Sequence, residues 1–135
     1  MTEKYVLTMD SETARMVSRA CELYARIVCG QYEEVSFETA MAWPEKFKSD
    51  HYCEMRDQAE AALQAAKLAM FPELSRHSSY GVSHNRKADT AWNVYQVVRH
   101  AMAWHEHPEG GNTVNFQKPM AFSGAPMPEI RIVEE

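Results

Sequence analysis

Residues 88–105 read ADTAWNVYQVVRHAMAWH, a segment that is rich in alanine, valine and tryptophan. Its apolar residues recur at three- and four-residue spacing, which predicts a helix that begins at Ala88 or Asp89 and ends at His105. Few polar positions remain around this helix, and such a helix is typical of the middle of an assembly. We therefore expect it to lie inside a helical bundle or at a contact between subunits of a homo-oligomer.

Two more helices are predicted before this one. Apolar residues repeat at the helical period after a capping Asp10 or Ser11, so we expect a helix from there to about Gly30 or beyond. Trp43-Pro44 ends any continuation, because proline disfavours helical geometry in the residue before it. An alanine-rich helix fits residues 49–70.

Both ends of the chain contain short segments with β-strand character, at residues 4–8, 113–116 and 129–133. The predicted fold is therefore mainly α, a three-helix core with short β-strands from the N- and C-terminal segments. A length of 135 residues suits one domain, and we expect residues 1–135 to form a single domain.

The composition excludes several classes of function. The chain has 19 acidic and 14 basic side chains, a net charge of -5, which argues against a protein that wraps duplex nucleic acid. No apolar run approaches the roughly 20 residues that cross a bilayer, so no membrane partner is expected. Three cysteines, an odd number without metal-ligand spacing, argue against a disulfide framework. These features favour a cytoplasmic protein.

Catalytic and metal-binding patterns are weak. His100 and His105 lie five residues apart, about 140° around a helix, so they are badly placed to share a metal. No serine or cysteine lies in a glycine-flanked nucleophile turn. We predict no catalytic residue, no metal ligand and no cofactor. A histidine- or metal-dependent phosphoesterase or nuclease is kept as an alternative.

The most informative feature is an arginine within the apolar helix. Tyr95 and Arg99 are four residues apart and share one helix face, while His100 and Trp104 share the neighbouring face. A buried charge needs a partner, and Glu33 or Glu34 could supply an ion pair.

A ligand is the other partner that would satisfy this arginine. Its guanidinium suits a phosphate group, and Trp104 or Tyr95 suits stacking on a base. Arg76, Arg86 and Lys87 could add phosphate donors, because four basic residues and one acid lie between residues 76 and 99. The predicted partner is a small anionic ligand, which is expected to be a nucleotide.

Three stretches together resemble a known family. They are LYARIVCGQYEE at 23–34, AWNVYQVVRHAMAWHEHPEGGNTVNF at 91–116 and PMAFSGAPMPEI at 119–130. They resemble a family of small hypothetical proteins encoded by tailed bacteriophages and prophages. No activity is attached to that family, so no catalytic residue is carried over.

The resemblance implies an accessory protein in the host-cell cytoplasm that acts by binding. One implied role is an oligomeric sponge that sequesters a cyclic-nucleotide immune signal. The alternative is an inhibitor or adaptor that binds a host protein through the acidic N-terminal half, where residues 1–60 hold twelve acids and seven basic residues.

Overall fold

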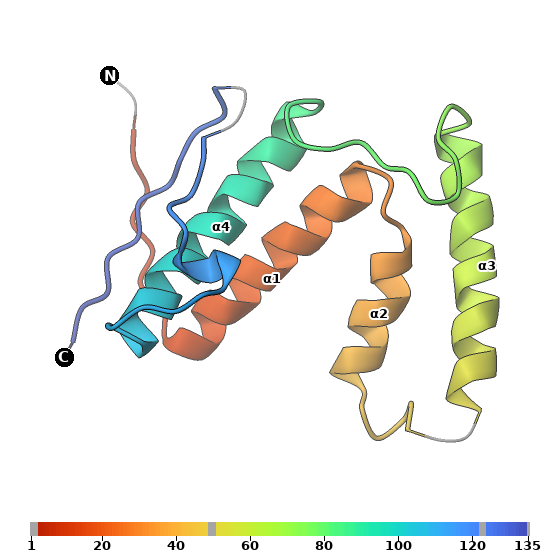
Figure 1. The fold of residues 1–135 in the computed structure, drawn as a ribbon, viewed down its shortest axis with the longest axis horizontal. Helices are drawn as coiled ribbons and strands as arrows, with labels where there is room; N and C mark the ends of the chain where they lie inside the picture. The colour runs from red at the N-terminus through yellow and green to blue at the C-terminus, as the bar shows by residue number, and fades with distance from the viewer. Residues whose placement is uncertain (1–2, 49–50, 122–123, 135) are drawn as a thin grey trace.

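The computed structural model describes residues 3–48, 51–121 and 124–134, and within them the chain is mainly helical (Figure 1). Its helices are α1 (Ser11–Val28), α2 (Glu33–Ala42), α3 (Tyr52–Met70) and α4 (Arg86–Glu106), followed by the short 3-10 helix η1 (Val114–Phe116). Figure 1 shows α1 and α4 side by side at one end of the molecule, and α2 and α3 as an antiparallel hairpin at the other.

The helix predicted to end at about Gly30 is α1, which ends at Val28, and the alternative that it continues past Gly30 is wrong because a second helix begins at Glu33. Asp10 caps the start of α1, since its carboxylate accepts a hydrogen bond from the Thr13 amide at 2.8 Å. Gly30 adopts a φ of +94°, a left-handed conformation that suits glycine and interrupts the helix. The chain then turns and begins α2, which the sequence did not predict as a separate helix.

The alanine-rich helix predicted over residues 49–70 corresponds to α3. It ends at Met70 as predicted and begins at Tyr52. The first two residues of the predicted helix, 49 and 50, lie outside the described residues.

The predicted three-helix core is replaced by a two-helix core. Small buried side chains line the contact between α1 and α4. They include Ala25 and Cys29 on one side and Ala88 and Val98 on the other. Small side chains let helix backbones approach closely. Among the described residues, α3 contacts α2 and makes no direct contact with α4.

The side of α4 away from α1 is covered by the C-terminal segment. Asn93 is fully buried and donates from Nδ2 to the Pro126 carbonyl at 3.2 Å. Gln96 donates from Nε2 to the Met120 carbonyl at 2.6 Å and accepts from the Met120 amide at 3.1 Å. The C-terminal segment is therefore bound through its backbone, by amide side chains of α4.

The short strands predicted at residues 4–8, 113–116 and 129–133 are not seen in the described part of the chain. Residues 114–116 form η1 instead, and the other two segments have no regular structure. A strand needs a neighbouring strand for its backbone hydrogen bonds, and side-chain character alone does not supply one.

The α2–α3 hairpin is attached to the rest of the molecule through a buried lysine. Lys67 is 2% exposed, and its ammonium donates to the Ser78 carbonyl at 2.5 Å and to the Arg76 carbonyl at 3.1 Å. These carbonyls belong to the loop that leads from α3 to α4. Lys67 therefore fixes the end of α3 to this loop.

Candidate functional site

A groove of about 450 Å³ lies between α1 and α4, with η1 at one end. Its charged lining is made of Arg15, Arg19 and Glu22 from α1, with Arg99 and Glu106 from α4. Pockets that bind small ligands typically enclose about 300–1,000 Å³. The groove therefore has the volume for a ligand of nucleotide size, and its arginines exceed its glutamates by one.

Tyr95 and Arg99 both line this groove, as their four-residue spacing predicts. Arg99 donates from Nη1 to the Tyr95 hydroxyl at 2.7 Å. The guanidinium carbon also lies 4.6 Å from the centre of the Tyr95 ring, within the range of a cation–π interaction. The tyrosine therefore holds the guanidinium in the groove but does not neutralise its charge.

Arg99 has no carboxylate partner among residues 3–48, 51–121 and 124–134. The ion pair with Glu33 or Glu34 is absent there, because both glutamates lie on α2. Arg99 is half-buried, and its bond to a neutral hydroxyl leaves its remaining guanidinium donors available. This arrangement suits an added anion.

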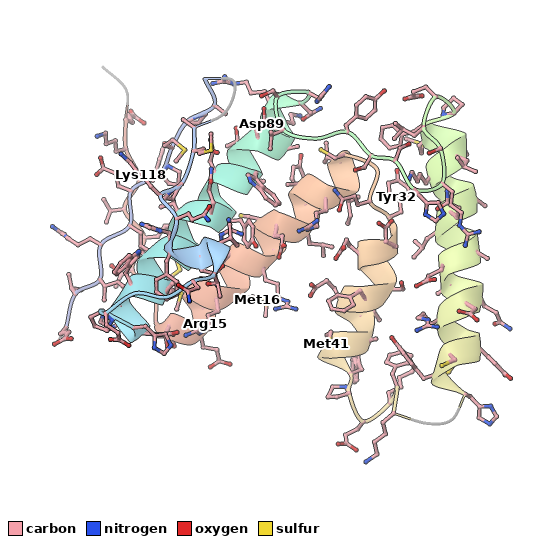
Figure 2. The ribbon with its side chains drawn as sticks, viewed as in Figure 1. Arg15, Met16, Tyr32, Met41, Asp89 and Lys118 are labelled. Carbon is pink, nitrogen blue, oxygen red and sulfur yellow. The ribbon has the colours of Figure 1, made fainter. Side chains whose placement is uncertain are left out.

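The two α1 arginines of the groove are already paired. Arg15 forms an ion pair with Glu106 across the groove, and Figure 2 shows Arg15 near η1. Arg19 donates from Nε to Glu38 at 2.7 Å, and the hydrogen bond and charge of Glu38 raise the pKa of Arg19. An anion in the groove would share both arginines with their glutamates.

His100 and Trp104 face away from the groove and bind the segment that follows α4. His100 Nδ1 lies 3.1 Å from the Asn115 carbonyl, and Trp104 donates from Nε1 to the Phe116 carbonyl at 3.1 Å. The Trp104 and Phe116 rings meet edge to face, with centres 5.4 Å apart. These two predicted ligand residues therefore position η1, and Phe116 of η1 lines one end of the groove.

The three basic residues predicted to assist are not in the groove. Arg86 and Lys87 are exposed at the start of α4, thirteen and twelve residues before Arg99, so they lie roughly 20 Å away along the helix axis. Arg86 donates to the Gly124 carbonyl at 3.4 Å. Arg76 is exposed in the loop before α4.

Sequence reasoning missed Arg15 and Arg19 as groove residues. Their four-residue spacing does place them on one face of α1. Which helix that face adjoins depends on tertiary packing, so the sequence pattern could not assign them to the face opposite Arg99.

A smaller hollow of about 180 Å³ lies at the other end of the α1–α4 contact. Its Arg26 is fully used, since it pairs with Glu22 at 3.0 Å, donates to Gln31 at 2.8 Å and lies over the Trp92 ring. Burial, and then the charge of Asp89, raises the pKa of Cys29, which keeps this thiol protonated. Within the described residues, this hollow offers no unpaired cation and no activated nucleophile.

The residue types that bind metals are scattered over the described ranges. No group of three or more histidine, cysteine, aspartate or glutamate side chains there is placed to hold a metal ion. Of the helices that the structure describes, none combines the length and apolarity needed to span a bilayer.

Comparison with protein-family models, curated proteins and solved structures finds no match to this chain.

Proposed function

We propose that this protein captures a small anionic ligand, such as a cyclic nucleotide, in the α1–α4 groove. The observation that carries the proposal is the half-buried Arg99, held by Tyr95 and unpaired with any carboxylate in the part of the chain described. A guanidinium in this setting gains strong, charge-assisted hydrogen bonds when a phosphate group arrives.

The rest of the groove supports a nucleotide over a simple anion. Tyr95 offers an aromatic face, although its ring also receives the Arg99 guanidinium. Glu22 and Glu106 offer carboxylate oxygens that can accept from the hydroxyl or amino groups of a nucleoside. Three arginines against two glutamates favour one or two phosphates over a polyanion.

The biological setting is also part of the proposal. The resemblance to phage and prophage proteins supports an oligomeric accessory protein of the host-cell cytoplasm that sequesters an immune signal. In such an oligomer the segments at residues 4–8 and 129–133 have the composition to pair as short strands. A phosphoesterase and an adaptor for a host protein are the alternative functions.

The experiment is a thermal-shift screen against cyclic dinucleotides and ADP-ribose derivatives, followed by calorimetric titration of any hit. A ligand present at 100 times its Kd stabilises the folded protein by about 2.7 kcal/mol and so raises Tm. Arg99→Gln removes the guanidinium and is expected to weaken Kd about 10- to 100-fold.

Arg86→Gln is the matched control, because it removes an exposed arginine from the same helix. We expect it to bind as the wild type does. Binding that survives Arg99→Gln but is lost in Arg86→Gln would move the site to the start of α4. A panel that produces no shift at all would contradict the proposed ligand class.

A further inference from the structure

One ion pair joins the α1–α4 groove to the α2–α3 hairpin. Arg19 lines the groove from α1, and its Nε donates to Glu38 of α2 at 2.7 Å. The Glu38 side chain is 20% exposed and the Arg19 side chain 49% exposed, so the carboxylate is the more buried partner. Of the ion pairs between described residues, this is the one that links the hairpin to the α1–α4 pair. The groove and α2 therefore share one guanidinium.

The α2 helix has few other attachments to the rest of the molecule. Within the described ranges it has no buried residue, and Glu38 is the one α2 residue whose side chain hydrogen-bonds to another element. The hydroxyls of Ser36 and Thr39 donate to carbonyls of α2 itself. The helix follows α1 after the turn at Gly30 (Figure 1). Because a helix with so little burial depends on its few contacts, we expect α2 to loosen when the pair with Arg19 weakens.

Arg19 is also the second cation available to an anion bound at Arg99. Arg99 donates to the Tyr95 hydroxyl at 2.7 Å. The hydrogen bond and charge of Glu38 raise the pKa of Arg19 and Tyr95 adds to this rise, so Tyr95 lies within electrostatic reach of both guanidiniums. Among the described residues Arg19 hydrogen-bonds through Nε alone, which leaves its two Nη groups as donors. A phosphate at Arg99 therefore meets Arg19 while Glu38 holds it.

We propose that Glu38 competes with an anion in the groove for Arg19, so that α2 weakens binding in the groove and binding in turn loosens α2. An anion that shares Arg19 with Glu38 puts two negative charges around one guanidinium, and these charges repel each other. The coupling is reciprocal, because the free energy by which Glu38 weakens binding equals that by which binding weakens the hold of Arg19 on Glu38. This inference rests on the proposed function and adds the regulation of the same site.

The first test is calorimetric titration of the purified chain with inorganic pyrophosphate. We expect Glu38→Gln to bind pyrophosphate about three- to fivefold more tightly than the wild type does, which is the range that exposed ion pairs support. Glu33→Gln is the matched control, because it removes the same charge from an exposed position of α2 that pairs with no cation in the part of the chain described. We expect Glu33→Gln to bind as the wild type does.

Hydrogen exchange tests the reciprocal effect on α2. In the wild type, saturating pyrophosphate should speed the exchange of α2 amides and leave α4 amides protected. Glu38→Gln should show the faster α2 exchange without pyrophosphate, and adding pyrophosphate should then change it little. Glu33→Gln should respond to pyrophosphate as the wild type does.

The outcomes separate this inference from the proposed function. Equal binding by Glu38→Gln and Glu33→Gln, or α2 exchange that pyrophosphate leaves unchanged, would overturn the inference alone. Weaker binding by Glu38→Gln would also overturn it, because Glu38 would then orient Arg19 towards the anion. A wild type that binds no pyrophosphate would overturn it as well, whereas the nucleotide screen and Arg99→Gln decide the proposed function separately.

Discussion

Alanine has opposite surroundings in the two halves of this molecule. In the α1–α4 pair, Ala25 and Ala88 are 4% and 2% exposed at the helix contact. In the α2–α3 hairpin, Ala62 and Ala65 face solvent. Helix propensity is the same in both halves, so propensity does not explain the difference. One half finds its packing partner within the chain, and the other half lacks one among the residues described.

Polar contacts follow the same division. The α1–α4 pair buries Asn93 and Gln96 and satisfies them with backbone groups of the C-terminal segment. Buried polar groups that are satisfied in this way fix a single arrangement, because any other arrangement leaves them unpaired. The hairpin has one comparable residue in its described part, Lys67, at its attachment point. We therefore expect the two halves to respond differently to substitution.

The largest effect is expected from Gln96→Leu, which breaks the well-packed half. The change removes the partner of the Met120 amide and carbonyl, and it removes the donor to Oδ1 of the fully buried Asn93. Unsatisfied buried groups cost about 1–3 kcal/mol each, so we expect a loss of about 3 kcal/mol in the free energy of unfolding. Urea denaturation measures it. Gln117→Leu, at an exposed glutamine, should change little, and equal stability of the two variants would contradict the role of Gln96.

A smaller effect is expected from Lys67→Met, which loosens the joint between the halves. It keeps an unbranched side chain, one heavy atom shorter, but leaves the Arg76 and Ser78 carbonyls without their donor. We expect a loss of about 2 kcal/mol, with α3 amides losing more exchange protection than α4 amides. Lys48→Met, at an exposed lysine, is the control. Uniform loss of protection over both helices would show that Lys67 supports the whole fold instead.

The smallest effect is expected from Glu34→Gln, which stabilises the hairpin half. Burial raises the pKa of Glu34. The positive charge of Arg26 lowers this pKa, and the negative charges of neighbouring glutamates raise it further. An acid whose pKa is raised on folding costs stability when it is ionised, and the cost disappears as the pH falls through the folded pKa. Glu34→Gln should therefore raise Tm at pH 7, with a gain that shrinks towards pH 4.

Glu33→Gln is the control for this measurement, because Glu33 lies in the same first turn of α2 and is exposed. Both substitutions remove a favourable charge from a helix N-terminus, so the comparison isolates the effect of burial. If the two variants have the same Tm at pH 7, burial of Glu34 does not matter.

The sequence predicts the helices of the well-packed half within about two residues, because their apolar periods are strong. The predicted helix at 88–105 begins earlier, at Arg86, since Asn85 caps it by accepting from the Ala88 amide at 3.0 Å. α2 escaped prediction because its apolar residues are spread around the helix and show no single face. Which side of α2 packs against other parts of the protein therefore cannot be read from its sequence.

For the candidate site, the sequence predicts what lies on one helix and fails where two elements meet. Tyr95 and Arg99 come together because four residues are about one helical turn. Nearness in sequence groups Arg76, Arg86 and Lys87 with them, but the length of α4 separates Arg86 and Lys87 from Arg99, and Arg76 lies in the loop before α4. The contribution of α1 to the groove is set by tertiary packing, which no local pattern encodes.

The hydrogen bonds between α4 and the C-terminal segment determine which residues of that segment tolerate substitution. Asn93 and Gln96 recognise main-chain atoms, which every amino acid carries. We therefore expect substitutions of the exposed Met120 side chain to be tolerated, and substitutions of the two amide side chains on α4 to weaken the contact. Ala125, which is 4% exposed, is the position in that segment where a larger residue would be rejected.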